Sequence, residues 1–209
     1  MIGILGGTFD PVHFGHLRPA LDVRQALGLD EIRLLPCHVP PHRPQPQAST
    51  QQRTLMLQAA IAGVDGFVID EREFERDGLS YTLDTLQSLR KDLPGKTLCL
   101  LVGMDAFCGL PTWHRWHELL NYCHIVVMTR PKAKFPDKGE LAEYIQLHRA
   151  RDAAMLRTQA TGLLWFQEVT QLEISATRLR GLLAAGEQAD YLLPAEVLDI
   201  IHIQGLYGS

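Results

Sequence analysis

The sequence is poor in lysine, with only five in 209 residues, so arginine supplies most of its 20 basic side chains. Acidic side chains number 24, and the formal net charge at pH 7 is −4. A protein that binds DNA or RNA over a broad surface needs an excess of basic charge there. The composition therefore excludes a chain-wide nucleic-acid footprint and leaves room only for a local basic site.

Cysteine and long apolar runs are scarce as well. The four cysteines are Cys37, Cys99, Cys108 and Cys123, and no two have the C-x-x-C spacing of a zinc or redox site. We expect them to be reduced, as in a cytoplasmic protein. No apolar run approaches the 18 residues of a membrane helix, and no basic region followed by a long apolar core precedes the first apolar run. Neither a membrane span nor a signal peptide is expected.

The length and the overall composition are those of an ordinary globular protein. At 209 residues the chain has the size of a single domain, large enough to bury a core without disulfide or metal staples. Hydrophobic residues make up 46% and charged residues 21%, which makes disorder, collagen and coiled coil unlikely classes.

Short apolar runs alternate with segments of helical periodicity along the chain. This alternation predicts an α/β fold with a parallel sheet. The runs are continuously apolar, which indicates helices on both faces of the sheet. Ligands in such folds bind beyond the carboxyl ends of the strands. We expect strands at residues 2–5, 32–35, 67–69, 97–102, 124–128 and 163–166, and helices at 17–27, 53–62, 81–92, 179–185 and 197–203.

Two loops that follow predicted strands stand out by composition. Residues 36–46 hold five of the twelve prolines, so this segment is predicted to be neither helix nor central strand. The segment also carries His42 and Arg43. Residues 130–139 hold Arg130 and three of the five lysines. Each loop is either a solvated connection or part of a site.

The strongest functional signal runs from Gly6 to His16 and reads GGTFDPVHFGH. It joins the first predicted strand to the first predicted helix, where a helix N-terminus can receive a phosphate. The two leading glycines allow backbone N–H groups to approach an anion closely. His13 and His16, three residues apart near a helix start, are expected to point to one side. Gly15 between them leaves space where a ligand could pack against the backbone.

Other interpretations of this segment are weaker. There is no G-K-[ST] of a Walker loop, no G-x-G-x-x-G with a following acid, and no H-E-x-x-H of a zinc protease. His13 and His16 could be metal ligands, but no third ligand follows at a convincing spacing. A tight turn whose histidines merely form hydrogen bonds is the remaining alternative.

A second signal, ISATRLR, runs from Ile174 to Arg180 and opens a late predicted helix. Ser175 is a plausible N-cap. The same hydroxyls, free N–H groups and an arginine fork could also bind an anion. Alone this signal is weak, because Ser or Thr caps before arginines are common.

Together the two motifs resemble the H-x-G-H and I-S-S-T-x-x-R motifs of the nucleotidyltransferase superfamily. More narrowly, the chain resembles the bacterial nicotinate-nucleotide adenylyltransferases. The segments follow the family's order from residue 3 to about 207 and so cover essentially the whole chain. Two departures are Ala176, where serine is commoner, and His114, where some relatives have tyrosine. The narrower match rests on PPHR at 40–43, SYTLDTL at 80–86, GMD at 103–105, PTW at 111–113, and LLP at 192–194 with Val197.

The resemblance implies a Rossmann-like α/β domain of nucleotidyltransferase type over residues 1–209, with the helical part from about residue 175 completing the ATP site. It implies transfer of AMP from ATP to nicotinate mononucleotide in NAD biosynthesis, giving deamido-NAD and pyrophosphate. The attack is direct, with no covalent enzyme intermediate. Mg²⁺ is implied, bound mainly through the ATP phosphates. No protein ligand for the metal, nucleic-acid partner or membrane partner is implied.

The resemblance also implies residue roles. His13, His16 and Arg180 are the expected catalytic residues, with His16 stabilising charge on the α-phosphate. Asp105 could at the same time be a helix N-cap, and Trp116 is a rival to Trp113 for the pyridine ring. The expected ATP-binding residues are Gly6, Gly7, Thr8, Phe9, His13, Gly15, His16, Gly103, Asp105, Arg130, Ser175, Thr177 and Arg180. The expected residues for the mononucleotide are His42, Arg43, Tyr81, Thr82 and Trp113.

Three alternatives stay open at this point. A pantetheine-phosphate adenylyltransferase would share both motifs but not the PPHR and PTW segments. An enzyme that prefers the amidated mononucleotide would need only a small change in its pocket, because the two substrates differ by one carboxylate in place of one amide. A nucleotide-binding regulator without catalysis could lose both histidines, which are present here. The oligomeric state and the order of substrate binding are not readable from the sequence.

Overall fold

The computed structural model describes residues 1–41, 44–131 and 133–208. Its six strands form one parallel sheet in the order β3-β2-β1-β4-β5-β6. This is the order of a Rossmann-type doubly wound fold, and it confirms the predicted α/β class. The strands are β1 (Ile2–Gly7), β2 (Glu31–Pro36), β3 (Phe67–Ile69), β4 (Leu98–Gly103), β5 (His124–Thr129) and β6 (Leu164–Glu168).

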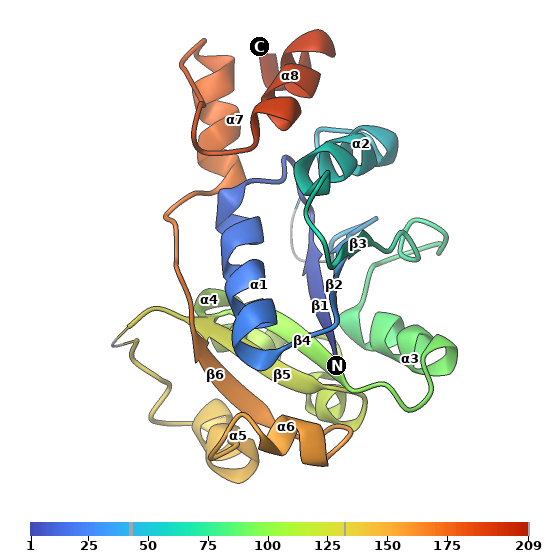
Figure 1. Ribbon diagram of the computed structural model, residues 1–209, viewed down its shortest axis with the longest axis vertical. Coiled ribbons are helices and arrows are strands. Elements are labelled where there is room, and N and C mark those ends of the chain that lie inside the picture. The colour runs from blue at the N-terminus through green and yellow to red at the C-terminus, as the bar shows by residue number, and fades with distance from the viewer. Residues whose placement is uncertain (42–43, 132, 209) are drawn as a thin grey trace.

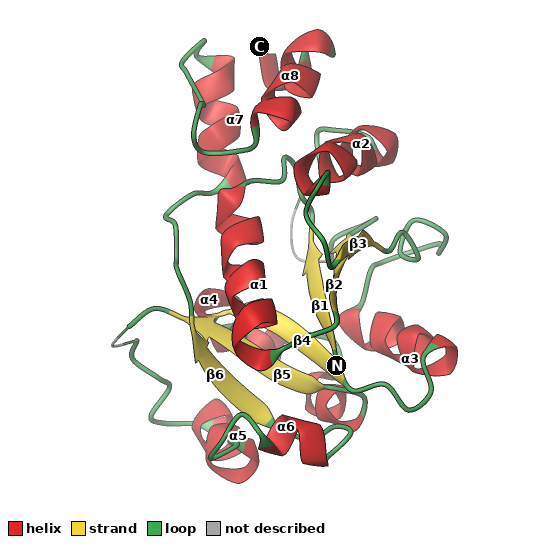
Figure 2. Ribbon diagram, viewed as in Figure 1, coloured by secondary structure: helices red, strands yellow, loops and turns green. Residues whose placement is uncertain are grey.

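Helices cover both faces of the sheet (Figures 1 and 2). One core contains side chains of α1 (Phe14–Leu27), α2 (Thr50–Ile61), α6 (Met155–Thr158), α7 (Ala176–Ala184) and α8 (Ala195–Ile203). The other core contains side chains of α3 (Thr82–Asp92), α4 (Met104–Cys108), α5 (Glu140–His148) and the 3₁₀ turns η1 (Leu110–Thr112) and η2 (Trp116–Asn121). A third 3₁₀ turn, η3 (Leu206–Gly208), follows α8.

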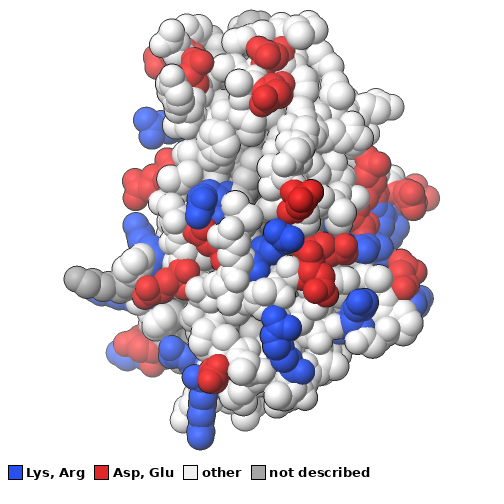
Figure 3. All heavy atoms as spheres, viewed as in Figure 1, with Lys and Arg blue, Asp and Glu red and all other residues white. Residues whose placement is uncertain are grey.

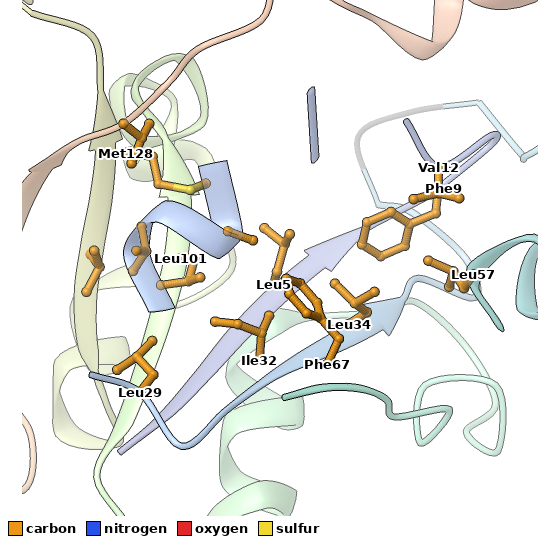
Figure 4. Close-up of a cluster of buried hydrophobic side chains, with 14 of the residues drawn as sticks. Leu5, Phe9, Val12, Leu29, Ile32, Leu34, Leu57, Phe67, Leu101 and Met128 are labelled. Atoms are coloured by element: carbon orange, nitrogen blue, oxygen red, sulfur yellow. The ribbon is translucent and has the colours of Figure 1, made fainter. Parts of the chain in front are cut away.

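The two cores follow from the alternation of side chains along each strand. In β1, Leu5 belongs to the first core and Ile4 to the second. In β4, Leu101 belongs to the first core and Val102 to the second. All six residues of β5 are buried, as expected of a strand covered on both faces. Figure 4 shows the first core, where Phe9 and Val12 of the loop after β1 lie near Leu57.

The structure differs from the predicted boundaries at several points. Helix α1 begins at Phe14, three residues early, because His13 is extended and acts as its N-cap. Helices α2 and α7 also begin three residues before their predicted starts, and β1 ends two residues later than predicted. Pro36 is the last residue of β2 rather than the first residue of the loop, and it pairs with Gly7. Helices α4, α5 and α6 were not predicted. Helices α4 and α6 are too short to show a period, with five and four residues. In α5, Leu141, Tyr144 and Ile145 do have helical spacing, and the prediction missed this signal.

β1 and β4 pair in parallel near their amino ends, over Ile2–Ile4 and Leu98–Leu100, and the two ribbons then diverge (Figure 1). After β1 the chain continues to β2, on one side of the β1–β4 pair in the sheet. After β4 it continues to β5, on the opposite side of that pair. The crevice beyond such a switch point is the usual ligand site of this fold. Basic and acidic side chains are interspersed on the face that Figure 3 shows. Within the described ranges, the helices are too short or too polar to cross a membrane.

Candidate active site

Two adjoining cavities open at the switch point. The Trp113 cavity has a volume of about 520 Å³ and the Arg180 cavity one of about 960 Å³, each named after one lining residue. They are neighbours, since one set of residues lines both. That shared wall comprises Thr8, Gly15, His16, Gly103 and Ala106.

The loop after β1 is held in an uncommon shape. Phe9 has a φ of +47°, in the left-handed region that a phenylalanine seldom adopts, and is only 1% exposed. Its ring lies under Gly7, where an added Cβ would approach within 3.2 Å, and its edge meets the His16 ring. The Phe9 side chain is therefore a core residue that contacts His16, and the predicted contact of its backbone with the nucleotide stays a prediction.

The two histidines of the motif do point to one side, as expected. Their rings stack with centroids 3.7 Å apart and planes 26° apart. The backbone N–H of His13 donates to Nδ1 of His16 over 3.3 Å, so a neutral His16 carries its proton on Nε2. His13 is 3% exposed and lacks a hydrogen-bond partner at Nδ1 within the described chain. Burial lowers the pKa of His13 to about 4, so this ring is neutral at pH 7.

Gly15 is required by the packing of its neighbours. A Cβ at this position would lie 2.9 Å from Nδ1 of His13 and 3.1 Å from the carbonyl oxygen of Ile174. The space left by the missing side chain is thus filled from within the protein, by His13 and by the segment leading into α7. The Gly15 backbone nevertheless lines both cavities.

The second motif forms the far side of the Arg180 cavity. Ser175, Thr177 and Arg180 all line it. Ser175 is also the N-cap of α7, because its hydroxyl accepts from the backbone N–H of Arg178 over 3.2 Å. Arg180 donates to the carbonyl oxygen of Asp10 over 2.7 Å and so joins the two motifs. Arg178 is exposed and does not line either cavity.

Two further elements border the Arg180 cavity. Arg130 and Lys134 reach it from the basic loop, and Arg130 forms an exposed ion pair with Glu173 at 3.6 Å. Asp105 lines it from α4, but the N-cap of that helix is Gly103 and Asp105 is its second residue. The N-cap hypothesis for Asp105 is wrong, and its exposed carboxylate faces a cavity instead.

The Trp113 cavity is lined by the two predicted segments that carry Tyr81 and Trp113. Tyr81, Thr82 and Trp113 line it, and His114 stacks on Tyr81 with ring centroids 4.4 Å apart. The rival Trp116 is only 5% exposed and packs into the second core. His42 and Arg43, both predicted to bind phosphate, lie outside the described residues.

Three buried polar residues that support these cavities were not among the predicted site residues, although Asp10 lies within the first motif. Arg53, 1% exposed, donates to the carbonyl oxygens of Thr8 and Cys37 over 2.9 and 2.7 Å. Glu73 lines the Trp113 cavity and accepts from the Thr85 hydroxyl over 2.7 Å, while burial raises the pKa of its carboxyl. The third is Asp10. A single buried acid or base carries no pattern of its own in a sequence.

The carboxylate of Asp10 is fully engaged within the protein. It accepts from the backbone N–H groups of Gln47 and Ala48 and from the hydroxyl of Tyr207. In the part of the chain that the structure describes, His, Cys, Asp and Glu do not gather in a group of three that could hold a metal. The metal interpretation of His13 and His16 therefore lacks a third ligand there. A Mg²⁺ that arrives on ATP phosphates, keeping its waters, fits this donor set.

Comparison with known proteins decides the family. The family model described as cytidylyltransferase-like matches residues 4–182. The chain belongs to this family. Relatives from Aeromonas salmonicida and Methylococcus capsulatus, both named probable nicotinate-nucleotide adenylyltransferase, are 53% and 50% identical to it. The matches cover 100% of this chain in both cases, and 97% and 100% of those relatives. Within the cytidylyltransferase-like family, the chain is therefore a member of the nicotinate-nucleotide adenylyltransferase group.

A solved structure supports the same fold. The Plasmodium falciparum nicotinic acid mononucleotide adenylyltransferase complexed with NaAD superposes with a TM-score of 0.72 at 19% identity. The superposition covers 99% of this chain and 96% of that one. The agreement extends over the sheet and the helices on both faces and confirms the predicted nucleotidyltransferase fold.

Proposed function

We propose that the chain transfers the adenylyl group of ATP to the 5′-phosphate of nicotinate mononucleotide, giving deamido-NAD and pyrophosphate in NAD biosynthesis. The observation that carries this proposal is the pair of cavities meeting at one wall that contains His16. One cavity offers anion-binding groups and the other an aromatic slot. The names of relatives about 50% identical over the full chain support the same reaction.

ATP occupies the Arg180 cavity in this proposal. Ser175, Thr177 and Arg180 bind the β- and γ-phosphates, using hydroxyls, the free N–H groups at the start of α7 and one guanidinium. Thr8 lies along the nucleotide, and Gly103 and Asp105 approach its sugar. Gly6 and Gly7 line the Trp113 cavity only, so their predicted contact with ATP would be made from that side of the shared wall. The helical part from about residue 175 thereby completes the ATP site of a single domain. Arg130 of the basic loop adds positive charge at the rim.

The mononucleotide occupies the Trp113 cavity. The flat face of Trp113 stacks on the pyridine ring, and Tyr81 and Thr82 complete the pocket. The roles of His42 and Arg43 on the substrate phosphate stay a prediction. The choice of the acid over the amide is part of the proposal, supported by the names of the relatives.

The transfer needs no protein nucleophile, because the attacking group is already an anion. A phosphate oxygen of the mononucleotide forms a bond to the α-phosphorus of ATP. The bond from that phosphorus to the oxygen bridging to the β-phosphorus breaks, and pyrophosphate leaves with the electron pair. Catalysis then consists of positioning and of stabilising the developing charge. His16, on the shared wall, donates from Nε2 to the α-phosphate, and the neutral His13 ring holds it in place.

Mg²⁺ belongs to the same proposal as a companion of ATP. When bound, it neutralises charge on the phosphates. It would be held mainly by phosphate oxygens and water, because the described His, Cys, Asp and Glu side chains do not form a group of three that could hold a metal. We assign the reaction to the cytoplasm, where both substrates are available.

A pyrophosphate-release assay with ATP and Mg²⁺ tests the function. Three acceptors are compared at equal concentration: nicotinate mononucleotide, its amide and phosphopantetheine. Fast release with the acid alone, with deamido-NAD identified as product, is the expected result. Faster release with the amide would reverse the assigned specificity. Release only with phosphopantetheine would leave the fold and refute the nicotinate assignment.

A further inference from the structure

Tyr207 contacts the first motif from the far end of the chain. Its hydroxyl donates to Oδ1 of Asp10 over 2.7 Å, although the two residues are 197 positions apart. Burial, together with this hydrogen bond, raises the pKa of the Tyr207 phenol. The backbone of Tyr207 has a φ of +63°, in the left-handed region. This region is uncommon for residues other than glycine.

Asp10 joins four segments that are distant in the sequence. Its carboxylate accepts from the N–H groups of Gln47 and Ala48 just before α2, over 2.8 and 3.1 Å, and from Tyr207. Its carbonyl oxygen accepts from Nη1 of Arg180, which also lies 3.8 Å from Oδ2 of the carboxylate. Asp10 is only 3% exposed, so these donors replace the water that a carboxylate otherwise needs. Removing one donor leaves a buried charge partly unsatisfied.

The Asp10 cluster borders the Arg180 cavity and not the Trp113 cavity. Asp10, Gln47 and Arg180 line the Arg180 cavity, and none of the three lines the Trp113 cavity. The loop from Thr8 to Asp10 is fixed by Arg53 at one end and by the Asp10 donors at the other. Between these anchors lies Phe9, whose ring supports His16. Asp10 thus contacts Arg180 directly and is linked to His16 through the neighbouring Phe9.

We propose that Tyr207 is a positioning residue for the donor nucleotide. By completing the donors around Asp10, it holds Arg180 and the Thr8–Asp10 loop in the geometry that binds the triphosphate. This inference rests on the proposed function, since it assumes that the Arg180 cavity receives ATP. It adds a residue outside both motifs to that site.

The test is the Tyr207→Phe variant, which removes one oxygen atom and keeps the ring. Tyr191→Phe is a matched control, because Tyr191 also has a φ of +63° but is 94% exposed. We expect Tyr207→Phe to raise the KM for ATP about tenfold, equivalent to about 1.4 kcal/mol. The KM for the mononucleotide stays within twofold, and Tyr191→Phe behaves as the unmodified protein. Equal KM values in the two variants, or an equal rise for both substrates, would overturn the proposal.

Two further measurements keep the test decisive. Calorimetric titration with ATP alone reports the donor site without turnover, so weakened binding in Tyr207→Phe supports the inference even if the acceptor has been assigned wrongly. An unmodified protein that binds ATP but does not react with nicotinate mononucleotide would refute the proposed function instead. In a double-mutant cycle with Asp10→Asn, the two losses of ATP affinity should not add. Full additivity would show that Tyr207 does not act through Asp10.

Discussion

The imidazole rings of His13 and His16 stack with their centroids 3.7 Å apart, yet their surroundings differ. His13 is 3% exposed and borders only the Arg180 cavity, whereas His16 lies on the wall that both cavities share. A ring whose pKa is lowered to about 4 carries no charge near neutral pH. In the proposed reaction, this difference gives His16 the direct contact with the reacting phosphate and His13 a supporting role.

Replacing His16 by alanine should slow turnover while leaving ATP binding nearly unchanged. The side chain is proposed to act mainly on charge that develops in the transition state, so its loss lowers kcat, by about 10²- to 10³-fold. Steady-state kinetics combined with calorimetric titration of ATP separates the two effects. Unchanged turnover would remove His16 from the mechanism.

The burial of His13 predicts a loss of stability in mild acid. The folded-state pKa of about 4 lies below the value of 6.5 for an exposed histidine, so between these values the unfolded chain binds more protons. The penalty is absent above about pH 6.5 and grows as the pH falls toward 4, reaching about 3 kcal/mol. Urea unfolding at pH 7.5 and pH 5 measures it.

The His13→Asn variant should lose less stability between these two pH values than the unmodified protein. The exposed His202, changed to asparagine in the same way, serves as the control and should not alter the difference. The buried His124 contributes the same background to all three proteins, because burial lowers its pKa as well. An identical pH dependence in His13→Asn would contradict a neutral, buried His13.

Adding one methyl group at Gly15 should disturb the stacked histidines. The new Cβ would lie 2.9 Å from the His13 ring and 3.1 Å from the backbone oxygen of Ile174, and such overpacking costs about 1–3 kcal/mol. We expect Gly15→Ala to lower both the free energy of unfolding and kcat. Gly181→Ala in α7 is the control, since its Cβ would meet open space and alanine favours the helix. Equal behaviour of the two variants would contradict this packing argument.

Trp113 and Trp116 should respond differently to replacement by alanine. Trp113 lines a cavity, so Trp113→Ala is expected to raise the KM for the mononucleotide about tenfold or more, with little change in the KM for ATP. Trp116 is buried in the second core, so Trp116→Ala should cost about 3–5 kcal/mol of stability. Kinetics and urea unfolding of both variants check this. A normal KM in Trp113→Ala would move the pyridine ring elsewhere.

Periodicity and motifs were sufficient to predict the sheet and the cluster of site residues. The apolar runs gave every strand to within a few residues, because strands buried on both faces are continuously apolar. Residues of both motifs line the Arg180 cavity, since each motif leads into a helix start: Thr8, Asp10, His13, Gly15 and His16 from the first motif, and Ser175, Ala176, Thr177 and Arg180 from the second. Short elements such as α4 and α6 were missed, because four or five residues hold too little periodicity.

The supporting network was beyond the reach of sequence reasoning. Arg53, Glu73 and Tyr207 are single polar residues whose importance comes from burial and from partners distant in the chain. Phe9 is a further example, because its place in the motif did not reveal that its ring lies in the core beside His16. The motif spacing could not reveal which histidine is buried, because this depends on how α7 and the loop after β1 pack together.

The central claim is a single direct transfer across the wall that the two cavities share. The most direct test uses ATP with a chiral sulfur substitution at the α-phosphorus and follows the configuration of that phosphorus in the dinucleotide product. One in-line displacement predicts inversion of configuration. Retention would require two displacements, and therefore a covalent adenylyl-enzyme, and would contradict the account.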